Sequence, residues 1–324
     1  MRISRKRSAD RSLAYLDRVN RAIDCILGQL DSPLRLERVA RAAGFSPFHF
    51  HRIFRSLVGE SVAEFVKRVR LERALVLLTR KDWPTRRRAT LTDIALACGF
   101  ASSSDFSRCF RQRYGVAPRA FDVESFRLQR RAEWLGAGDD ARERLKVRRL
   151  PRGANPDGFK VRLRRLPARQ VAYVRVVNSF QPGAVAGAAA RLLAWADERK
   201  LAGGQWLGYM WDDPEIVAPA QCRYDLAVEV PRPIREDGVG HLRLAAMEVA
   251  EIEIRGGVDL ELRAIDYFYR TWLPTSGYLP TEQPVFEAFH GRPFAHGSEH
   301  FELRLQFPVA RVVEISAGRS RRGW

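Results

Sequence analysis

The hydrophobic and polar positions near the N-terminus form a pattern that occurs twice. The first copy reads Ala40-x-x-x-Gly44-Phe45, then Phe50-x-Arg52-x-Phe54-Arg55, Gly59 and Phe65. The second copy reads Ala95-x-x-x-Gly99-Phe100, then Phe106-x-Arg108-x-Phe110-Arg111, Gly115 and Phe121, with one additional residue between its Gly and its central Phe. Each copy predicts a helix, a tight turn and a second helix.

Each residue type in the first copy has a physical role. The small Ala40 lets two helices approach closely, and Gly44 supplies the positive φ that ends a helix. Ser46 can cap the next helix, with Pro47 at its first position. A single copy would be equally consistent with a helical hairpin that has one solvated face. Two matching copies favour DNA binding, because two such units can place two helices in neighbouring segments of the major groove.

Apolar spacing predicts the helices of this region. They are expected at Leu13–Leu30, Leu36–Ala43, Pro47–Leu57, Ser61–Arg80, Leu91–Cys98, Ser103–Tyr114 and Pro118–Leu128. Lys81–Thr90 is expected to be a polar, basic connection. Residues 129–157, rich in Arg, Gly and Asp, are expected to form a basic linker with a short helix around Arg142–Val147.

The period of the pattern changes after Phe159. Alternation predicts strands at Val161–Leu163, Val171–Val177, Trp206–Trp211, Tyr224–Val230, Leu242–Ile254 and Phe301–Phe307. Helices are expected at Pro182–Leu201 and Leu260–Leu273, the second followed by an aromatic, Pro-rich stretch over Pro274–Phe289. This β-α-β-β order, met twice, predicts an α+β domain of two similar halves with an antiparallel sheet; the alternative is one irregular α+β domain.

Charge follows the same division of the chain. The 324 residues include 56 Lys and Arg and 38 Asp and Glu, a net charge of +18. Residues 1–150 hold 33 basic and 17 acidic residues, a net charge of +16, whereas residues 151–324 hold 23 and 21, a net charge of +2. A basic domain attracts the phosphate backbone, so the composition favours nucleic acid over an anionic membrane as the partner of the duplicated region.

Other functional classes find little support in the sequence. No run of about 18 apolar residues is present to span a membrane, and no apolar stretch follows the basic N-terminus, so no secretory signal is expected. His49 and His51 should point to different sides of a helix, so no metal site and no cofactor are predicted. The four cysteines lack CxxC spacing, as expected of reduced thiols in the cytoplasm: Cys25, Cys98, Cys109 and Cys222.

Residues 34–121 resemble the DNA-binding domain of the AraC/XylS family of transcription regulators. The resemblance rests on Ile94-Ala95-x-x-x-Gly99-Phe100, Phe106-Ser107-Arg108-x-Phe110-Arg111, Gly115-x-x-Pro118 and Phe121. It implies an all-α, bi-lobed double helix-turn-helix domain that binds double-stranded promoter DNA. The implied DNA-binding residues are Phe48, His51, Arg52, Arg55, Ser104, Asp105, Ser107, Arg108 and Arg111. Arg52 and Arg108 are expected at bases; phosphate contacts or intramolecular ion pairs are the alternatives.

Residues 160–308 resemble the GyrI-like effector-binding domain. The residues that carry the resemblance are Asp212-Asp213-Pro214, Cys222-Arg223-Tyr224-Asp225, Trp272-Leu273-Pro274-x-Ser276-Gly277-Tyr278, Phe286-Glu287 and Phe307-Pro308-Val309. Ala245-Ala246-Met247-Glu248 departs from the family pattern, in which many members have a Pro-Gly-Gly turn, and leaves the local loop open.

The GyrI-like resemblance implies a cleft between the two halves of the domain that takes a small cationic or aromatic effector. The implied ligand-binding residues are Tyr173, Trp206, Tyr224, Trp272, Tyr278 and Glu287. Aromatic ring faces attract cations, and a carboxylate among them would stabilise a buried positive charge. The alternative is that the rings belong to the core and that Glu287 caps a helix or pairs with an arginine.

The two resemblances predict a cytoplasmic, ligand-responsive transcription regulator, in which the effector alters how the N-terminal domain engages promoter DNA or RNA polymerase. Activation is the expected mode, and the sequence leaves repression open. One chain carries both lobes, so a monomer suffices to bind DNA. The expected boundaries are 1–128 for the DNA-binding domain, 129–157 for the linker, 158–310 for the effector domain and 311–324 for a tail. No catalytic residue is predicted. The alternatives are a hydrolase that uses Glu287 as a general base on a reactive small molecule, and a module that binds a protein such as a topoisomerase.

Overall fold

The chain divides into two compact units, each described separately below. The computed structural model describes residues 15–311, apart from residues 17, 80–88, 135–148, 235, 237, 282 and 298. The N-terminal unit comprises Met1–Gln129 and Glu236–Gly240, and the C-terminal unit comprises Arg130–Arg235 and His241–Trp324. The predicted connection over 81–88, the helix at 142–147 and the tail from residue 312 lie outside the described residues.

Two helix pairs of equal length form the repeated part of the N-terminal unit. Each pair consists of a 7-residue and a 12-residue helix: α2 (Leu36–Ala42) with α3 (Pro47–Val58), and α5 (Leu91–Ala97) with α6 (Ser103–Tyr114). The additional residue of the second copy falls in the turn, which spans residues 98–102 rather than 43–46. The predicted helix-turn-helix units are therefore confirmed to within a residue at each end.

The same local devices bound both of the longer helices. The side chains of Ser46 and Ser102 each accept the backbone N–H of the residue three positions later, at 3.5 Å and 3.1 Å. Gly59 and Gly115 end the helices in the left-handed region, with φ of 86° and 81°. An N-cap bond of this kind is worth about 1 kcal/mol, and a glycine enters the left-handed region without a Cβ penalty.

Matching aromatic trios pack the longer helix of each pair against the segment that follows it: α3 against α4, and α6 against the residues before α7. The edge-to-face or near-perpendicular rings are Phe50–Phe54–Phe65, with centroids 5.5 Å apart at both steps, and Phe106–Phe110–Phe121, with centroids 5.5 Å and 5.2 Å apart. The four rings contributed by α3 and α6 are completely buried. Burying one such side chain stabilises the fold by about 1.5–3 kcal/mol, so the inward faces of α3 and α6 are fixed by apolar packing.

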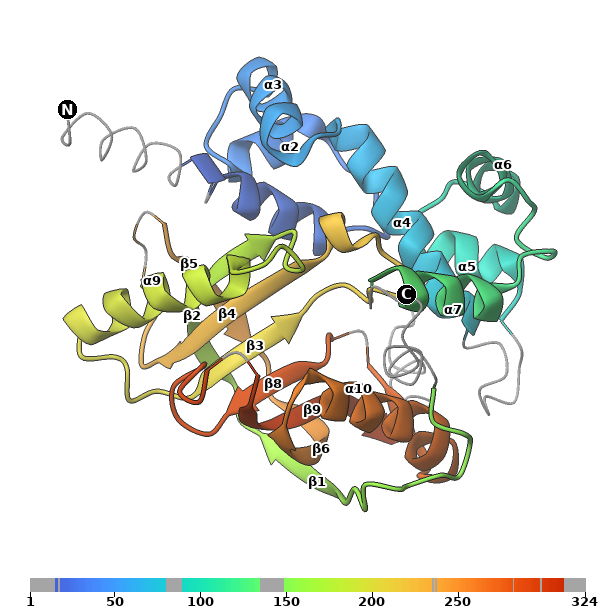
Figure 1. Cartoon of the computed structure of the whole chain (residues 1–324). Helices are drawn as coiled ribbons and strands as arrows, with labels where there is room; N and C mark the ends of the chain where they lie inside the picture. The colour runs from blue at the N-terminus through green and yellow to red at the C-terminus, as the bar shows by residue number, and fades with distance from the viewer. Residues whose placement is uncertain are drawn as a thin grey trace. The chain divides into compact units, whose positions relative to one another are not determined.

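Helix α4 (Val62–Thr79) lies between the two pairs and contacts α3, α5 and α6 (Figure 1). Arg70 on α4 donates hydrogen bonds to the carbonyl oxygens of Leu30 and Ser32, at 2.9 Å each. Gly99, in the turn of the second pair, has a φ of 81°, and a Cβ at this position would collide with the Leu30 carbonyl oxygen. Only glycine lets this turn approach that backbone so closely.

In the described residues the C-terminal unit contains one sheet of nine strands, ordered β1-β6-β9-β8-β3-β4-β2-β5 with β7 beside β9. The described pairings between neighbouring strands are antiparallel. The strands are β1 (Val161–Leu166), β2 (Arg169–Val177), β3 (Trp206–Met210), β4 (Arg223–Val230), β5 (Gly240–Leu244), β6 (Met247–Gly256), β7 (Tyr278–Pro280), β8 (Phe286–Phe289) and β9 (Phe301–Arg311).

Two helices cover one face of this sheet. Helix α9 (Ala184–Glu198) packs on β2 and β4, and α10 (Val258–Tyr267) packs on β6 (Figure 1). Strands β3 and β8 lie between these strands in the sheet order. Along the chain the elements run β2-α9-β3-β4 and then β6-α10-β7-β8-β9. The helices therefore flank the central strands β3 and β8, which carry two of the candidate ligand residues, Trp206 and Glu287.

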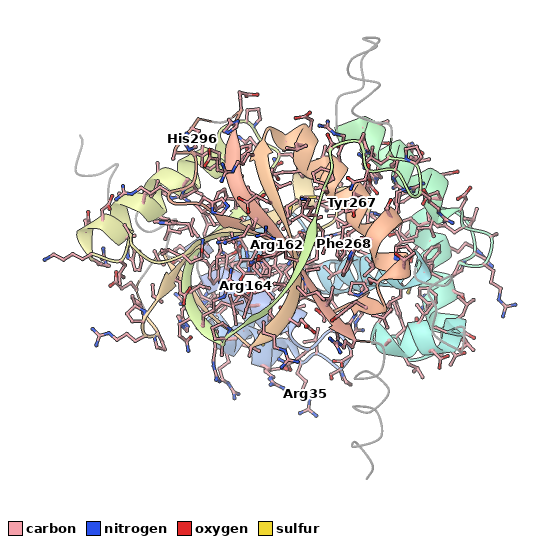
Figure 2. The ribbon with its side chains drawn as sticks, turned by 90° about the horizontal axis from the view of Figure 1, so that it is seen from below. Arg35, Arg162, Arg164, Tyr267, Phe268 and His296 are labelled. Atoms are coloured by element: carbon pink, nitrogen blue, oxygen red, sulfur yellow. The ribbon has the colours of Figure 1, made fainter. Side chains whose placement is uncertain are left out.

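Edge strand β1 carries three exposed arginines. Figure 2 shows two of them, Arg162 and Arg164, on this strand, and Arg165 follows. Only Leu166 of the strand is buried. Charged side chains on an open edge disfavour pairing with a strand of another molecule, so this pattern protects the sheet from aggregation.

Several predicted boundaries were wrong. The strand expected over Leu242–Ile254 is two strands, β5 and β6, separated by residues 245–246. The helix expected over Leu260–Leu273 is α10 followed by a short π-helical segment, Phe268–Trp272. The Pro-rich stretch contains β7 and β8. The helix expected over Pro118–Leu128 is α7 (Val123–Trp134), which begins later than predicted and ends within the predicted linker.

Candidate functional site

The outward faces of α3 and α6 present polar and basic side chains. On α3, His51, Arg52 and Arg55 are exposed, and Phe48 is 71% exposed although it is apolar. On α6, Ser104, Arg108 and Arg111 are exposed, while Asp105 and Ser107 are half-buried. The buried phenylalanines occupy another side of each helix, so every candidate DNA-binding residue except Asp105 and Ser107 is exposed.

The two matching arginines differ in their surroundings. Arg108 Nη2 donates to Asp105 Oδ1 at 2.7 Å, an ion pair within one turn of α6. Among the described residues Arg52 has no acidic partner. The intramolecular ion pair foreseen as an alternative for both arginines is therefore present for one of them. Lys67 on α4 donates a hydrogen bond to Gln112 of α6 at 2.8 Å.

A cluster of acidic groups occupies the helix-covered face of the C-terminal sheet. Glu287 on β8 accepts a hydrogen bond from the Tyr224 hydroxyl on β4. The Glu261 carboxyl group, from α10, forms a hydrogen bond with that of Glu287. On β3, between β4 and β8, Gly208 has no side chain, and a Cβ there would collide with both Tyr224 Oη and Glu287 Oε2. The glycine makes room for the pair over the strand.

Burial sets the protonation of this cluster. Glu261 and Glu287 are 6% and 8% exposed, and among the described residues neither forms an ion pair. Burial raises the pKa of Glu287 from 4.5 to about 7, although hydrogen bonds from Tyr224 and Glu261 oppose the rise. Burial and the neighbouring Glu287 charge raise the pKa of Glu261 well above its usual range. A hydrogen bond between two carboxyl groups requires a proton, so the pair holds at least one.

The remaining candidate ligand residues are distributed over both faces. Trp206 precedes Gly208 by two residues on β3 and so shares its face; it is buried and donates its indole N–H to the Ala202 carbonyl oxygen at 3.0 Å. Tyr173 opposes Ala227 in the β2–β4 register, whereas Tyr224 opposes Val176. Tyr173 therefore points to the other face, where it packs in an apolar cluster.

Trp272 and Tyr278 belong to an aromatic stack. Their ring centroids are 6.1 Å apart, and the Trp272 ring also stacks on Phe268 at 5.3 Å. Phe268 in turn stacks on Phe307 of β9 at 3.8 Å. The structure thus brings Tyr224 and Glu287 into direct contact, and groups Trp272 with Tyr278.

Sequence reasoning missed Glu261 and Gly208. Glu261 lies in the first turn of α10, where an acidic residue is usually explained by the helix dipole. Its contact with Glu287 depends on how the helix packs on the sheet, which has no local signal. Among the described residues no group of three or more His, Cys, Asp or Glu is placed to hold a metal ion. In that part of the chain, no helix is long and apolar enough to cross a membrane.

Two protein families match the two units. Residues 39–122 match the helix-turn-helix domain family, and residues 159–310 match the family described as the GyrI-like small molecule binding domain. The DNA gyrase inhibitor of Serratia proteamaculans (strain 568) is 33% identical over 157 residues, 47% of this chain and 98% of the relative. The chain belongs to the AraC-type regulators with a GyrI-like domain. Its homologues include named transcription regulators.

Two further relatives align with part of this AraC-type chain. The probable transcription factor PqrA of Proteus vulgaris is 31% identical over 93 residues, 29% of this chain and 71% of the relative. The right origin-binding protein of Escherichia coli (strain K12) is 31% identical over 111 residues. That alignment spans 34% of each chain, so the chain covers about a third of the length of this relative.

Proposed function

We propose that this AraC-type protein is a sequence-specific DNA-binding regulator of transcription. Helices α3 and α6 would enter neighbouring segments of the major groove, about 34 Å apart, as the two lobes of one domain. The observation that carries the proposal is the structural repeat itself. Two 12-residue helices share caps and buried faces, and each exposes an arginine at the matching position, Arg52 and Arg108.

The DNA-binding part of the proposal can be tested with the full chain and a duplex that the chain selects from a random pool. Each arginine that pairs with guanine is worth about 1–3 kcal/mol, so the double variant Arg52→Ala/Arg108→Ala should bind the selected duplex at least tenfold more weakly. The control Arg232→Ala/Arg243→Ala removes the same charge from exposed positions of the C-terminal unit. Equal losses in the two double variants would reject these helices as the readers of DNA.

The C-terminal unit is proposed to bind a small cationic or aromatic effector near Glu287. The support is a buried carboxyl pair without a described cation, beside the Tyr224 ring, in a chain of the GyrI-like family. A buried negative charge is costly until a positive charge neutralises it. We expect the ligand between the two β-α-β-β halves, and expect it to shift the domain between two states that differ in DNA binding.

A permanently charged probe tests the ligand site. Phenyltrimethylammonium should bind the full chain at pH 8, and Glu287→Gln should weaken binding at least tenfold while leaving DNA binding by the free protein unchanged. The neutral analogue tert-butylbenzene should not distinguish the two proteins. Equal binding of the cation by both proteins would remove Glu287 from the site.

Two other functions of the C-terminal unit remain testable. The pKa of about 7 suits Glu287 to accept a proton from water, which favours the hydrolase alternative; loss of turnover of an electrophilic ester in Glu287→Gln would support it. The name of one relative, DNA gyrase inhibitor, favours protein binding, which a pull-down of gyrase by the full chain would reveal.

The remaining features of the proposal concern organisation. We propose domains at residues 1–128 and 158–310, joined by 129–157, in a cytoplasmic protein that binds DNA as a monomer. Activation through RNA polymerase is the mode we expect. Transcription in vitro with purified polymerase, with and without the protein, would test it.

A further inference from the structure

The repeat provides an internal comparison between its two DNA-facing helices. Aligning the copies on Phe50 and Phe106 matches Arg52 with Arg108 but matches His49 with Asp105. An acidic residue therefore precedes the outward arginine by three positions, about one helical turn, in α6 only. The two lobes share an arginine but differ in what surrounds it.

Asp105 is held by the helix that carries it. Its Oδ1 atom accepts hydrogen bonds from Arg108 Nη2 at 2.7 Å and from the thiol of buried Cys109 at 3.7 Å. The Asp105 side chain is 34% exposed and that of Arg108 is 73% exposed. The carboxylate thus lies against the helix while the guanidinium projects from it. Ile53, which replaces Cys109 in the first copy, offers no donor for a carboxylate.

We propose that Asp105 is a positioning residue that acts on DNA through Arg108 rather than by touching a base. This inference rests on the proposed DNA-binding function. A guanidinium already held at one edge loses less side-chain conformational entropy when its free edge forms hydrogen bonds with guanine O6 and N7. The carboxylate also offsets the arginine's charge, which reduces attraction to phosphates of any sequence. Arg108 therefore selects bases more sharply than Arg52.

The competing explanation is that Asp105 itself accepts a hydrogen bond from a cytosine amino group. The two explanations predict different positions of lost selectivity. If Asp105 acts through Arg108, then Asp105→Ala and Arg108→Ala reduce selectivity at the same base pair. The double variant then loses no more selectivity than Arg108→Ala alone. If Asp105 itself contacts cytosine, the two variants reduce selectivity at different base pairs, and their effects add in the double variant.

The experiment measures competition by the full chain between its selected duplex and all single-base-pair variants of that duplex, with circular dichroism as a check on folding. We expect Asp105→Ala to lower discrimination at one base pair about tenfold while its affinity for a scrambled duplex stays equal or rises. Asp105→Asn, which keeps the shape and an acceptor oxygen, should retain more of the discrimination. Equal loss of affinity for selected and scrambled duplexes would overturn the proposal.

A transplant in the first lobe gives the matched control. His49→Asp places a carboxylate three residues before Arg52. We expect this variant to discriminate more strongly between the selected base pair and its alternatives at the position where Arg52→Ala loses selectivity. An unchanged ratio of affinities for the selected duplex and the variant duplexes at that position would overturn the claim that the carboxylate increases the base selectivity of the arginine. Failure of the wild-type chain to select any duplex would instead reject the proposed function.

Discussion

Replacing Gly99 by alanine tests how the second helix pair is fixed to the rest of the N-terminal unit, through the backbone at Leu30 and through Arg70 of α4. Gly99 has a φ of 81°, where an alanine costs about 1–2 kcal/mol. Its new Cβ would also collide with the Leu30 carbonyl oxygen, which belongs to the backbone, and lie 2.9 Å from Cζ and Nε of Arg70. Overpacking of this kind costs about 1–3 kcal/mol, so Gly99→Ala should destabilise the unit by about 2–5 kcal/mol.

Gly115 is the matched control, because its φ is also 81° and no atom lies within 4 Å of an added Cβ. Gly115→Ala should therefore cost only about 1–2 kcal/mol, the backbone penalty. Native-state hydrogen exchange of the α5 and α6 amides measures the difference without requiring the two units to unfold together. Equal loss of protection in the two variants would show that the contact between the Gly99 turn and Leu30 does not fix the second pair.

Three further predictions concern the C-terminal unit. Asp225→Asn leaves the guanidinium of Arg175 buried without its bidentate partner at 2.7 Å, and should cost about 3–5 kcal/mol in urea denaturation; a loss below about 1 kcal/mol would contradict the buried pair. Because the pKa of Glu287 is raised in the folded state, only the unfolded state loses this proton between about pH 4.5 and 7. The free energy of unfolding should therefore fall by up to about 3 kcal/mol over that range, compared with Glu287→Gln. Parallel pH profiles of the two proteins would refute this expectation. Gly208→Ala should abolish phenyltrimethylammonium binding and spare DNA binding, whereas Gly203→Ala, whose Cβ meets open space, should change neither; retained binding in Gly208→Ala would argue against a site over this strand.

The helix pairs were predictable because their signals are local. Periodic phenylalanines, serine N-caps and left-handed glycines act within one or two turns, so the sequence places α3 and α6 to within a residue. The break between β5 and β6 left no such signal. Apolar residues continue through Ala245-Ala246, and neither glycine nor proline marks a turn there.

The composition of the acidic cluster depends on pairing that the sequence does not encode locally. Tyr173 and Tyr224 both belong to alternating strands, but the β2–β4 register places them on opposite faces. Glu261 joins Glu287 only because α10 packs on the sheet. The sequence therefore singled out Glu287 and Tyr224, which are in contact in the structure, but carried no signal for Glu261, whose carboxyl group forms a hydrogen bond with that of Glu287.

The most direct test of the central claim is a selection of preferred duplexes from a random pool by the full wild-type chain and by the single variants Arg52→Ala and Arg108→Ala. The account predicts two blocks of sequence preference about one helical turn, roughly 10 base pairs, apart. Each variant should lose the preference in a different block. A single block, or loss of the same positions in both variants, would contradict the claim that α3 and α6 read successive segments of the major groove.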